Sequence, residues 1–346
     1  MRPFEPDFSM PLPAHPDQHG IGIVGIGGIA RYAHLPAYRK AGFRVVGLSS
    51  RTEQAVRDAA AEWHIPHAFT DWRRLLDLPE VTVVDITVPF DEDRLPIVRA
   101  AAERGKHILM QKPMAHSLEA AEEMVRLCRQ YGVRLAVNQN ARWAPPYRAA
   151  AQAIRQGLLG DLCLLIHEMQ NNQDSQAWFN TRWYGRQERF LLMEYSVHHV
   201  DLVRFWSGQE PVRVRASVTR KPGQASRGEM IGMVQMEFAD RSLALVLDNN
   251  ASYPRADIFS RFRIEGSRGL ITGEAMATPA VRIQSDELQD GDSRPALSGA
   301  WFPDGFIGTM GELLCAIEEH REPSISGADN LHTLRIIFDA YRDAGL

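Results

Sequence analysis

The segment Gly20-Ile-Gly-Ile-Val-Gly-Ile-Gly-Gly-Ile-Ala30 decides the fold. Its β-branched run, 21–24, predicts a buried strand, and Gly25, Gly27 and Ala30 then follow in the pattern G-x-G-x-x-A. The first glycine permits a tight turn, the second lets a pyrophosphate approach the backbone, and the small third residue lets helix and strand pack closely. A phosphate at such a turn meets the free N–H groups of a helix N-terminus. The predicted dinucleotide contacts are Gly25, Gly27, Gly28 and Ile29.

Two regions with different patterns of predicted secondary structure follow this turn. Strands and helices alternate up to about residue 143, which predicts an α/β, doubly wound parallel sheet. After Ala144-Pro145-Pro146, strand-like runs with few helices between them predict a mostly antiparallel α+β domain. We expect a Pro-rich arm over 1–18, a dinucleotide-binding domain over 19–143, and a substrate-binding and oligomerisation domain over 144–346. The arm either is disordered or lies across the protein's own surface or a partner subunit.

Composition excludes several classes of partner. The chain has 346 residues and a net charge of −4, with Lys and Arg scattered along it, so nucleic acid is not an expected partner. No apolar run approaches membrane-spanning length, and the N-terminus lacks a signal pattern. Cys128, Cys163 and Cys315 are far apart in apolar stretches, which is typical of reduced thiols rather than disulfides or a metal site. These features predict a cytoplasmic protein without a metal.

Two runs of the second domain are apolar on both faces. In 231–238, Val234, Met236 and Phe238 share one face, whereas Ile231 and Met233 lie on the other. The run 243–247 is apolar throughout. Such a sheet needs cover on both faces, and the sequence offers few helices there, so we expect at least a dimer.

The end of the second strand bears on the choice of cofactor. An Asp or Glu at this position favours NAD by accepting hydrogen bonds from the ribose hydroxyls. This chain has Ser49-Ser50-Arg51-Thr52, with no acid before Glu53. Hydroxyls and a guanidinium suit a 2′-phosphate, so we expect NADP to be preferred, with NAD possible, and Ser50 and Arg51 to bind the cofactor. Alternatively, Arg51 stacks on the adenine, which either cofactor permits.

Further motifs give the chain a resemblance to the Gfo/Idh/MocA family, the glucose–fructose oxidoreductase and inositol dehydrogenase group. They are the glycine turn, Thr87-Val-Pro89, Gln111-Lys112-Pro113, and Glu194-Tyr-Ser-Val-His198-His199-Val-Asp201. The resemblance covers nearly everything from Gly20 to the C-terminus. It implies an N-terminal Rossmann domain and a C-terminal domain whose large open, mostly antiparallel sheet makes a homodimer or homotetramer.

The resemblance also implies roles for residues around Lys112. The family's Glu-Lys-Pro motif is Gln111-Lys112-Pro113 here, and its lysine contacts the nicotinamide ribose and polarises the reacting C–O bond. Gln111 replaces the family's glutamate, which removes a carboxylate near the lysine. Thr87, Pro89 and Gln111 are expected beside the cofactor, and Asn140 is expected to contact the cofactor amide or the substrate.

The family's Asp-x-x-x-His pair corresponds to Glu194 and His198. Residues four apart share a helix face, so the carboxyl and imidazole can point into one cleft. The resemblance implies that His198 takes the hydroxyl proton while hydride leaves the carbon, or gives it back in reverse, a role that suits imidazole near neutral pH. Glu194 would orient the sugar hydroxyl or tune the imidazole. The expected substrate contacts are Lys112, Asn140, Glu194 and His198.

The sequence therefore predicts an oxidoreductase that moves a hydride between NADP or NAD and a CH–OH carbon of a sugar, polyol or cyclitol. Two alternatives keep the same fold. One is a glycosidase that uses tightly held NAD for transient oxidation. The other is a non-catalytic sensor of dinucleotide or sugar, against which the presence of both Lys112 and His198 argues.

Overall fold

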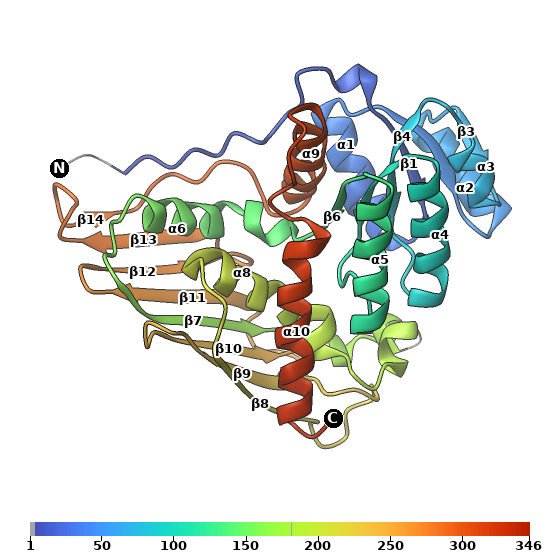
Figure 1. The fold of residues 1–346 in the computed structure, drawn as a ribbon. Coiled ribbons are helices and arrows are strands. Elements are labelled where there is room, and N and C mark those ends of the chain that lie inside the picture. Colours follow the sequence, from blue (N-terminus) through green and yellow to red (C-terminus); the bar gives the residue numbers. More distant parts are fainter. Residues whose placement is uncertain (1–3, 181) are drawn as a thin grey trace. The chain divides into compact units, whose positions relative to one another are not determined.

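A computed structural model describes residues 4–180 and 182–346, which form two compact units (Figure 1). The Rossmann unit contains Ser9–Trp143 and Phe302–Leu331, and the large-sheet unit contains residues 4–8, Ala144–Trp301 and His332–Leu346. Each unit therefore joins stretches that are distant in sequence. The domain bounds 1–18, 19–143 and 144–346 stay a prediction, because these units are defined by packing rather than by sequence order.

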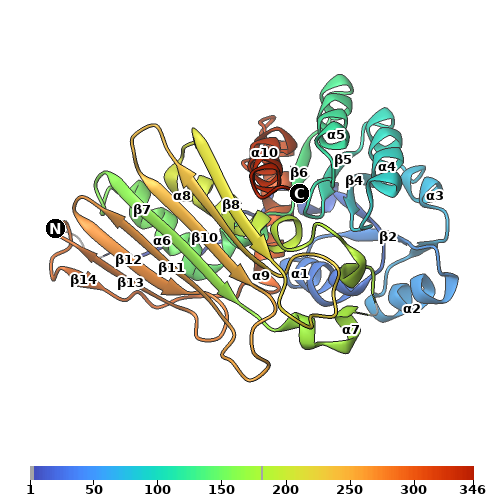
Figure 2. The same cartoon turned by 90° about the horizontal axis from the view of Figure 1, so that it is seen from below.

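The Rossmann unit is built on a six-stranded parallel sheet in the order β3-β2-β1-β4-β5-β6. Its strands are β1 (Gly20–Val24), β2 (Val45–Ser49), β3 (His67–Phe69), β4 (Val81–Ile86), β5 (His107–Met110) and β6 (Leu135–Val137). The central strand β1 is buried along its whole length, because helices cover both faces of such a sheet. Figure 2 shows α1 and α2 on one side and α4 and α5 on the other. The predicted doubly wound parallel sheet is confirmed.

The helices of this unit are η1 (Pro16–Gln18), η2 (Ala30–His34, π-helical), α1 (Leu35–Ala41), α2 (Glu53–Trp63), α3 (Trp72–Leu76), α4 (Asp91–Glu103), α5 (Leu118–Gln130), η3 (Asn140–Trp143) and α9 (Asp304–Glu318). Helix α5 shows why they form: the Ser117 hydroxyl accepts from the Ala120 N–H at its N-terminus, and one apolar face is buried. Helix α9 joins the same apolar core as β1, through Phe306 and Met310.

The described part of the N-terminal arm lies against its own chain. The N–H groups of Ala14 and His15 donate to the Glu318 carboxylate of α9, at 2.7 and 2.9 Å. Near its start, the Asp7 N–H donates to Gln152 in the large-sheet unit, and Phe4 is buried. Residues 1–3 lie outside the described residues.

The large-sheet unit contains an eight-stranded sheet in the order β14-β13-β12-β11-β7-β10-β9-β8. The strands are β7 (Leu162–Gln170), β8 (Arg213–Thr219), β9 (Ile231–Glu237), β10 (Leu243–Asn249), β11 (Phe259–Gly266), β12 (Gly269–Glu274), β13 (Ala280–Ser285) and β14 (Asp292–Ser293). Neighbouring strands are antiparallel except β7 and β10, so the predicted mostly antiparallel sheet is confirmed.

One face of this sheet is covered by α6 (Pro145–Arg155) and α8 (Val197–Ser207) (Figure 1). The other helices of the unit are η4 (Gln173–Ser175), α7 (Ala177–Asn180), η5 (Trp183–Arg186), η6 (Leu192–Ser196, π-helical) and the main part of α10 (Gly327–Asp343). In the described part of the chain, no helix combines the length and the apolar character needed to span a bilayer.

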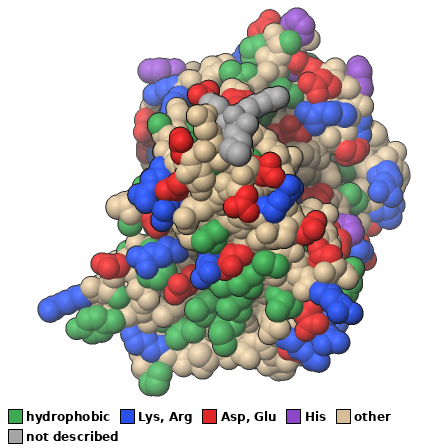
Figure 3. Space-filling view, turned by 90° about the vertical axis from the view of Figure 1, so that its left-hand side faces the viewer, with side chains coloured by type: hydrophobic (Ala, Val, Ile, Leu, Met, Phe, Trp, Pro, Cys, Tyr) green, Lys and Arg blue, Asp and Glu red, His purple; other side chains and the backbone are tan. Residues whose placement is uncertain are grey.

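The opposite face of the large sheet carries apolar side chains that remain accessible. In β9, Val234 and Met236 are buried, whereas Met233 is 44% exposed, as the predicted alternation requires. Register aligns Met233 with Leu247, and Leu245 with Ile166, so these side chains share one face. Figure 3 shows hydrophobic side chains gathered on the lower half of one view, between charged groups. We call the side chains of Ile166, Met233, Leu243, Leu245 and Leu247 the outer apolar face.

His107 makes the stability of the Rossmann unit depend on pH. Its Nδ1 accepts the Arg134 N–H at 2.9 Å, and burial, with the nearby Arg134 charge, lowers its pKa to about 4. In the unfolded chain, the His107 imidazole takes up a proton once the pH falls below its ordinary pKa of about 6.5. In the folded chain it stays neutral down to about pH 4, so protonation between these values favours the unfolded state. We expect the melting temperature to fall as pH drops from about 6.5 toward 4, and less steeply in His107→Gln. Parallel profiles from calorimetry for the two proteins would contradict this.

Candidate functional site

The glycine turn joins β1 to the helical segment that contains η2. Gly25 has a φ of +101°, and a Cβ there would lie 2.8 Å from Thr87 Oγ1. Gly27 differs, because it is exposed and an added Cβ would meet no atom within 4 Å. Gly28, also exposed, and the half-buried Ile29 begin the helix. The turn therefore has tight packing on its inner side and an open backbone on its outer side, which a phosphate group could approach.

The residues after β2 have the exposure that a ribose-binding segment needs. Ser50 is half-buried and its N–H donates to Phe69 O at 3.1 Å, whereas Arg51 is exposed. The acid that follows is already engaged: Glu53 pairs with Arg57 on α2 at 2.6 Å. Cationic and hydroxyl groups are thus presented at the end of β2.

The turns after β4 and β5 are fastened together by Arg94 of α4. Its Nε donates to Val88 O at 2.7 Å, and its Nη1 donates to Pro113 O and, at 3.3 Å, to Met114 O. Because Arg94 is only 2% exposed, these backbone carbonyl groups replace the water molecules that would otherwise accept hydrogen bonds from its guanidinium. Thr87 and Pro89 are thereby held beside the turn that carries Lys112.

Lys112 is half-buried at the carboxyl end of β5. Its N–H donates to the side-chain Oε1 of the preceding residue, Gln111, at 2.7 Å. Gln111 N donates to Ile86 O at 2.9 Å, which ties this turn to the end of β4. The carboxyl ends of parallel strands meet at one edge, and the structure places Gly25, Thr87, Gln111 and Lys112 at that edge.

A buried polar network lies behind Gln111. Four members lie within helices or strands, and Gln111 and Asn138 directly follow β5 and β6. The members are His34 (η2), Tyr38 (α1), Asp85 (β4), Gln111, Asn138 and Thr309 (α9). His34 and Asp85 form its centre, with Nδ1 and Oδ2 2.7 Å apart and both side chains fully buried. Asn140 follows on η3, buried, with its Nδ2 donating to Asn138 O at 3.4 Å.

Glu194 and His198 lie on consecutive helical segments of the large-sheet unit. Glu194 is in the π-helical η6 and is buried, whereas His198 is half-buried in the first turn of α8. The His198 ring meets the Trp301 ring edge-on, with centroids 6.3 Å apart. The sequence predicts a plain α-helical spacing, but the pair spans a π-to-α junction, a feature frequent at functional sites.

The segment that carries Glu194 is held at its start by a buried carboxylate. Glu229 accepts from the N–H groups of Phe190 (3.0 Å) and Leu192 (3.2 Å) and from the Tyr341 hydroxyl (2.7 Å). Burial raises the pKa of Glu229, although these donors offset part of that effect. A carboxylate from the segment just before β9 therefore caps η6 in the manner of an N-cap residue.

His199 and Asp248 anchor α8 on the sheet. His199 Nδ1 lies 2.9 Å from Asp248 Oδ2, which also accepts from the Ser196 hydroxyl at 2.5 Å. His167 stacks on His199 with ring centroids 3.8 Å apart and an interplanar angle of 20°. One ligand atom each from His167, His199 and Asp248 lies within 4.8 Å of the others, and the His199–Asp248 pair already joins two of the three side chains.

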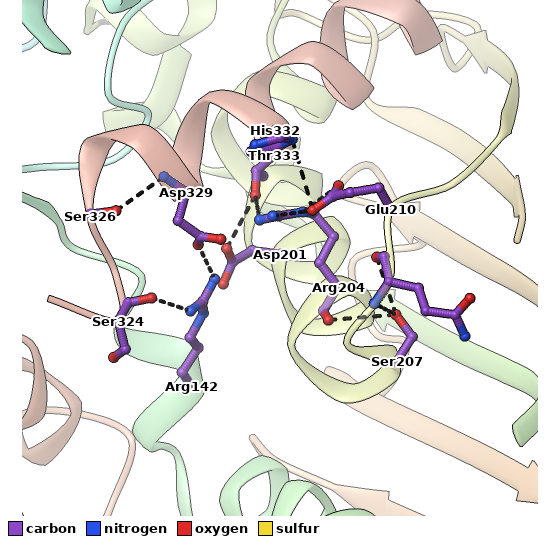
Figure 4. Close-up of polar contacts among 11 residues, drawn as sticks. Arg142, Asp201, Arg204, Ser207, Glu210, Ser324, Ser326, Asp329, His332 and Thr333 are labelled. Atoms are coloured by element: carbon purple, nitrogen blue, oxygen red, sulfur yellow. Dashed lines mark hydrogen bonds and ion pairs between the residues drawn. The ribbon is translucent and has the colours of Figure 1, made fainter. Parts of the chain in front are cut away.

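Two polar clusters fix the supporting helices (Figure 4). In the large-sheet unit, the Thr333 hydroxyl donates to Asp201 at 3.2 Å and accepts from Arg204 at 2.9 Å, and Arg204 pairs with Glu210. In the Rossmann unit, Arg142 donates to Ser324 O at 2.9 Å and to Asp329 at 2.8 Å.

The structure thus brings the predicted residues together in two groups. The cofactor-side residues and Lys112 gather at one edge of the Rossmann sheet, and Glu194 and His198 lie on η6 and α8 of the other unit. Sequence reasoning missed His34, Asp85, Arg94 and Glu229. A charged side chain inside an otherwise apolar run is a signal for Asp85 in β4 alone, because Arg94 and Glu229 stand in polar stretches of the sequence.

Comparison with known proteins agrees with this arrangement. A family model described as "Oxidoreductase family, NAD-binding Rossmann fold" (GFO_IDH_MocA) matches residues 19–139, and the GFO/IDH/MocA C-terminal domain model matches residues 147–272. Together they cover more than half of the chain.

Among curated relatives, D-apiose dehydrogenase of Paraburkholderia graminis is 26% identical over 330 residues, covering 93% of this chain and 86% of its own. The 1,5-anhydro-D-fructose reductase of Ensifer adhaerens is 27% identical over 322 residues, covering 90% and 92%. Among solved structures, an Agrobacterium radiobacter oxidoreductase in complex with NAD+, L-tartaric acid and magnesium is 22% identical, with a TM-score of 0.84 over 95% of this chain and 96% of that one. The similarity to this solved structure shows that the two chains share a fold.

Proposed function

Because the chain belongs to the Gfo/Idh/MocA family of NAD-binding oxidoreductases, we propose that it transfers a hydride between NADP or NAD and a sugar, polyol or cyclitol carbon. Its curated relatives are named as dehydrogenases and reductases of sugars and polyols, so it is an oxidoreductase that acts on CH–OH groups. The observation that carries the proposal is the edge of the Rossmann sheet, where the open glycine turn and Lys112 lie together.

The residues present at that edge fit a dinucleotide. The space beside Gly27 is open, and Thr87 fills the inner side of Gly25, so a pyrophosphate could meet the backbone from outside only. When bound, the nicotinamide supplies or accepts the hydride. Thr87, Pro89, Gln111 and Asn140 would position it from the ends of β4, β5 and β6.

Lys112 and His198 would both act on the substrate oxygen, in different roles. The Lys112 ammonium would polarise the C–O bond, which stabilises negative charge on oxygen as hydride is lost or gained. The His198 imidazole would take the hydroxyl proton during oxidation and return it during reduction. Glu194, buried on η6, would orient a substrate hydroxyl or the His198 ring, and Asn140 would add a polar contact.

A substrate panel tests the proposal. Aldoses, sugar acids and inositols would be supplied with NADP or NAD, and reduced cofactor would be followed by absorbance. We expect reduction with at least one polyhydroxylated compound. Hydrolysis of a glycoside with no net cofactor reduction would favour the glycosidase alternative, and ligand binding without turnover would favour the sensor.

Arg51 should discriminate between the two cofactors. Loss of a charge-assisted hydrogen bond costs about 1.5–3 kcal/mol, so Arg51→Ala should weaken NADP binding about 10- to 100-fold and leave NAD binding nearly unchanged. Fluorescence titration measures both, with Arg57→Ala, an exposed neighbour on α2, as control. An equal loss for both cofactors would indicate adenine stacking, and tighter NAD than NADP binding by the unchanged protein would overturn the NADP preference.

The outer apolar face is the proposed subunit interface of a homodimer or homotetramer. Leu245 lies within it, paired in register with Ile166, so Leu245→Arg places a charge among apolar side chains and should yield monomers. Light scattering at micromolar concentration reads the mass, with Leu12→Arg as an exposed control in the other unit. A monomeric mass for the unchanged protein would refute the interface.

We also propose a cytoplasmic location. Cys128, Cys163 and Cys315 are free thiols, which is the usual state of cysteines in a reducing compartment.

A further inference from the structure

We propose that His34 is a positioning residue for Lys112, acting as a neutral imidazole through the side chain of Gln111. The proposal rests on the catalytic role proposed for Lys112. It concerns contacts inside the Rossmann unit only, which connect the π-helical turn η2 to the turn after β5.

The contacts of the Gln111 side chain fix the orientation of its amide group. Its Oε1 accepts the Lys112 N–H at 2.7 Å and lies 3.3 Å from Asn138 Nδ2. Because the oxygen is occupied by these donors, the amide nitrogen is the atom that faces His34, 3.2 Å from Nε2. An amide nitrogen can only donate, so His34 Nε2 must accept.

The other ring nitrogen of His34, Nδ1, faces a carboxylate. With Nε2 as acceptor, the ring proton sits on Nδ1 and is donated to Asp85 Oδ2 at 2.7 Å. The same oxygen accepts the Tyr38 hydroxyl at 2.7 Å. Burial and the neighbouring Asp85 raise the pKa of Tyr38, so this hydroxyl stays protonated and keeps donating.

The remaining neighbours agree with this assignment. Asn138 Nδ2 is a second donor near His34 Nε2, at 3.4 Å, and its Oδ1 is occupied by the Thr309 hydroxyl at 2.9 Å. A proton on Nε2 would therefore point at two amide NH2 groups. The Phe306 ring covers a further side of the imidazole, with centroids 4.8 Å apart, and brings no charge. The two amide NH2 groups beside Nε2 and the Asp85 carboxylate beside Nδ1 thus favour the tautomer that carries its proton on Nδ1.

The result is a directed chain of hydrogen bonds that ends on the backbone of Lys112. Asp85 fixes the His34 ring, the ring fixes the Gln111 amide, and the amide oxygen holds the Lys112 N–H. A glutamate at 111 would reverse the contact to His34, because its carboxylate accepts where the amide donates. Among the described residues, Asp85 Oδ1 already lacks a hydrogen-bond partner, so a second buried carboxylate would be accommodated only with a protonated His34.

The test compares Gln111→Glu, Gln111→Met and the exposed control Gln130→Glu in the full-length protein. Two NMR readouts need no turnover: the ring nitrogen shifts of His34, assigned with His34→Gln, and the backbone amide shift of Lys112. We expect the neutral Nδ1–H tautomer in the unchanged protein and in the control, an imidazolium in Gln111→Glu, and a shifted Lys112 amide in Gln111→Met.

Kinetics then tests the consequence for Lys112. Loss of this one orienting hydrogen bond predicts a roughly tenfold lower kcat for Gln111→Met, with KM little changed. Gln111→Glu should retain more of kcat than Gln111→Met at the same pH, because its carboxylate can still accept the Lys112 N–H.

An Nε2–H tautomer or an imidazolium in the unchanged protein would overturn the proposal. An unshifted Lys112 amide, or unchanged kcat in both variants, would overturn it as well. If instead no substrate is turned over by the unchanged protein, the proposed function fails, while the two NMR readouts still decide whether His34 positions Lys112.

Discussion

Replacing His198 by asparagine is expected to lower kcat by about 10²- to 10⁴-fold, the usual contribution of a general acid or base. Asparagine keeps a hydrogen-bonding group of similar reach but cannot take up the hydroxyl proton. His198 is half-buried in the first turn of α8, with a ring edge toward Trp301, so the substitution removes little packing and the fold should survive. Steady-state kinetics with the substrate found in the panel measures the loss.

The pH profile separates a proton-transfer role from a structural one. The limb of kcat that reports ionisation of His198 should disappear in the variant, while binding of reduced cofactor should change little. His64→Asn is a matched control, because His64 is exposed and has a φ of +56°, a conformation that asparagine tolerates well. A folded His198→Asn protein with kcat within a few-fold of the unchanged enzyme would refute the assignment.

Replacing Lys112 by methionine is expected to lower kcat/KM by about 10²- to 10³-fold, the range found when one group that stabilises developing oxyanion charge is removed. Methionine retains the length and much of the apolar stem, so the loss reports the ammonium. The Lys112 N–H contact to Gln111 involves the backbone and should persist, which predicts an unchanged melting temperature. Kinetics and calorimetry on the same sample test both statements.

Lys221→Met, in the segment between β8 and β9, is the control for removal of a lysine charge. If Lys112 touches the nicotinamide ribose as proposed, its methionine variant should also bind cofactor more weakly, whereas the control should not. Wild-type kcat/KM in a folded Lys112→Met protein would exclude a polarising role for this lysine.

Local sequence patterns were sufficient for the parts of the fold that depend on local physics. The run 21–24 and Gly25 lie next to each other, so strand, turn and positive φ could be predicted from a short window. Alternation in 231–238 likewise predicted which side chains of β9 share a face, because a strand alternates its side chains whatever surrounds it.

Long-range packing supplied what these patterns could not. His34 and Asp85 are 51 residues apart, and Thr309 is 171 residues from Asn138, so no local pattern announces their network. The π-helical turns η2 and η6 were not predicted, for a related reason. Their sequences fit an ordinary α-helix, and only the surrounding contacts favour the wider turn. Glu229 caps η6 from 35 residues beyond Glu194, again without a sequence signal.

Isotope tracing follows the proposed hydride itself to or from a substrate carbon. The protein would be supplied with NADPH or NADH that carries deuterium at both C4 positions, together with a panel of keto sugars, lactones and oxidised cyclitols, and the products would be analysed by mass spectrometry. We expect a product with one deuterium bound to carbon, formed at least about a hundredfold more slowly by Lys112→Met and His198→Asn. A product that forms without the label, or forms equally fast in both variants, would contradict this expectation.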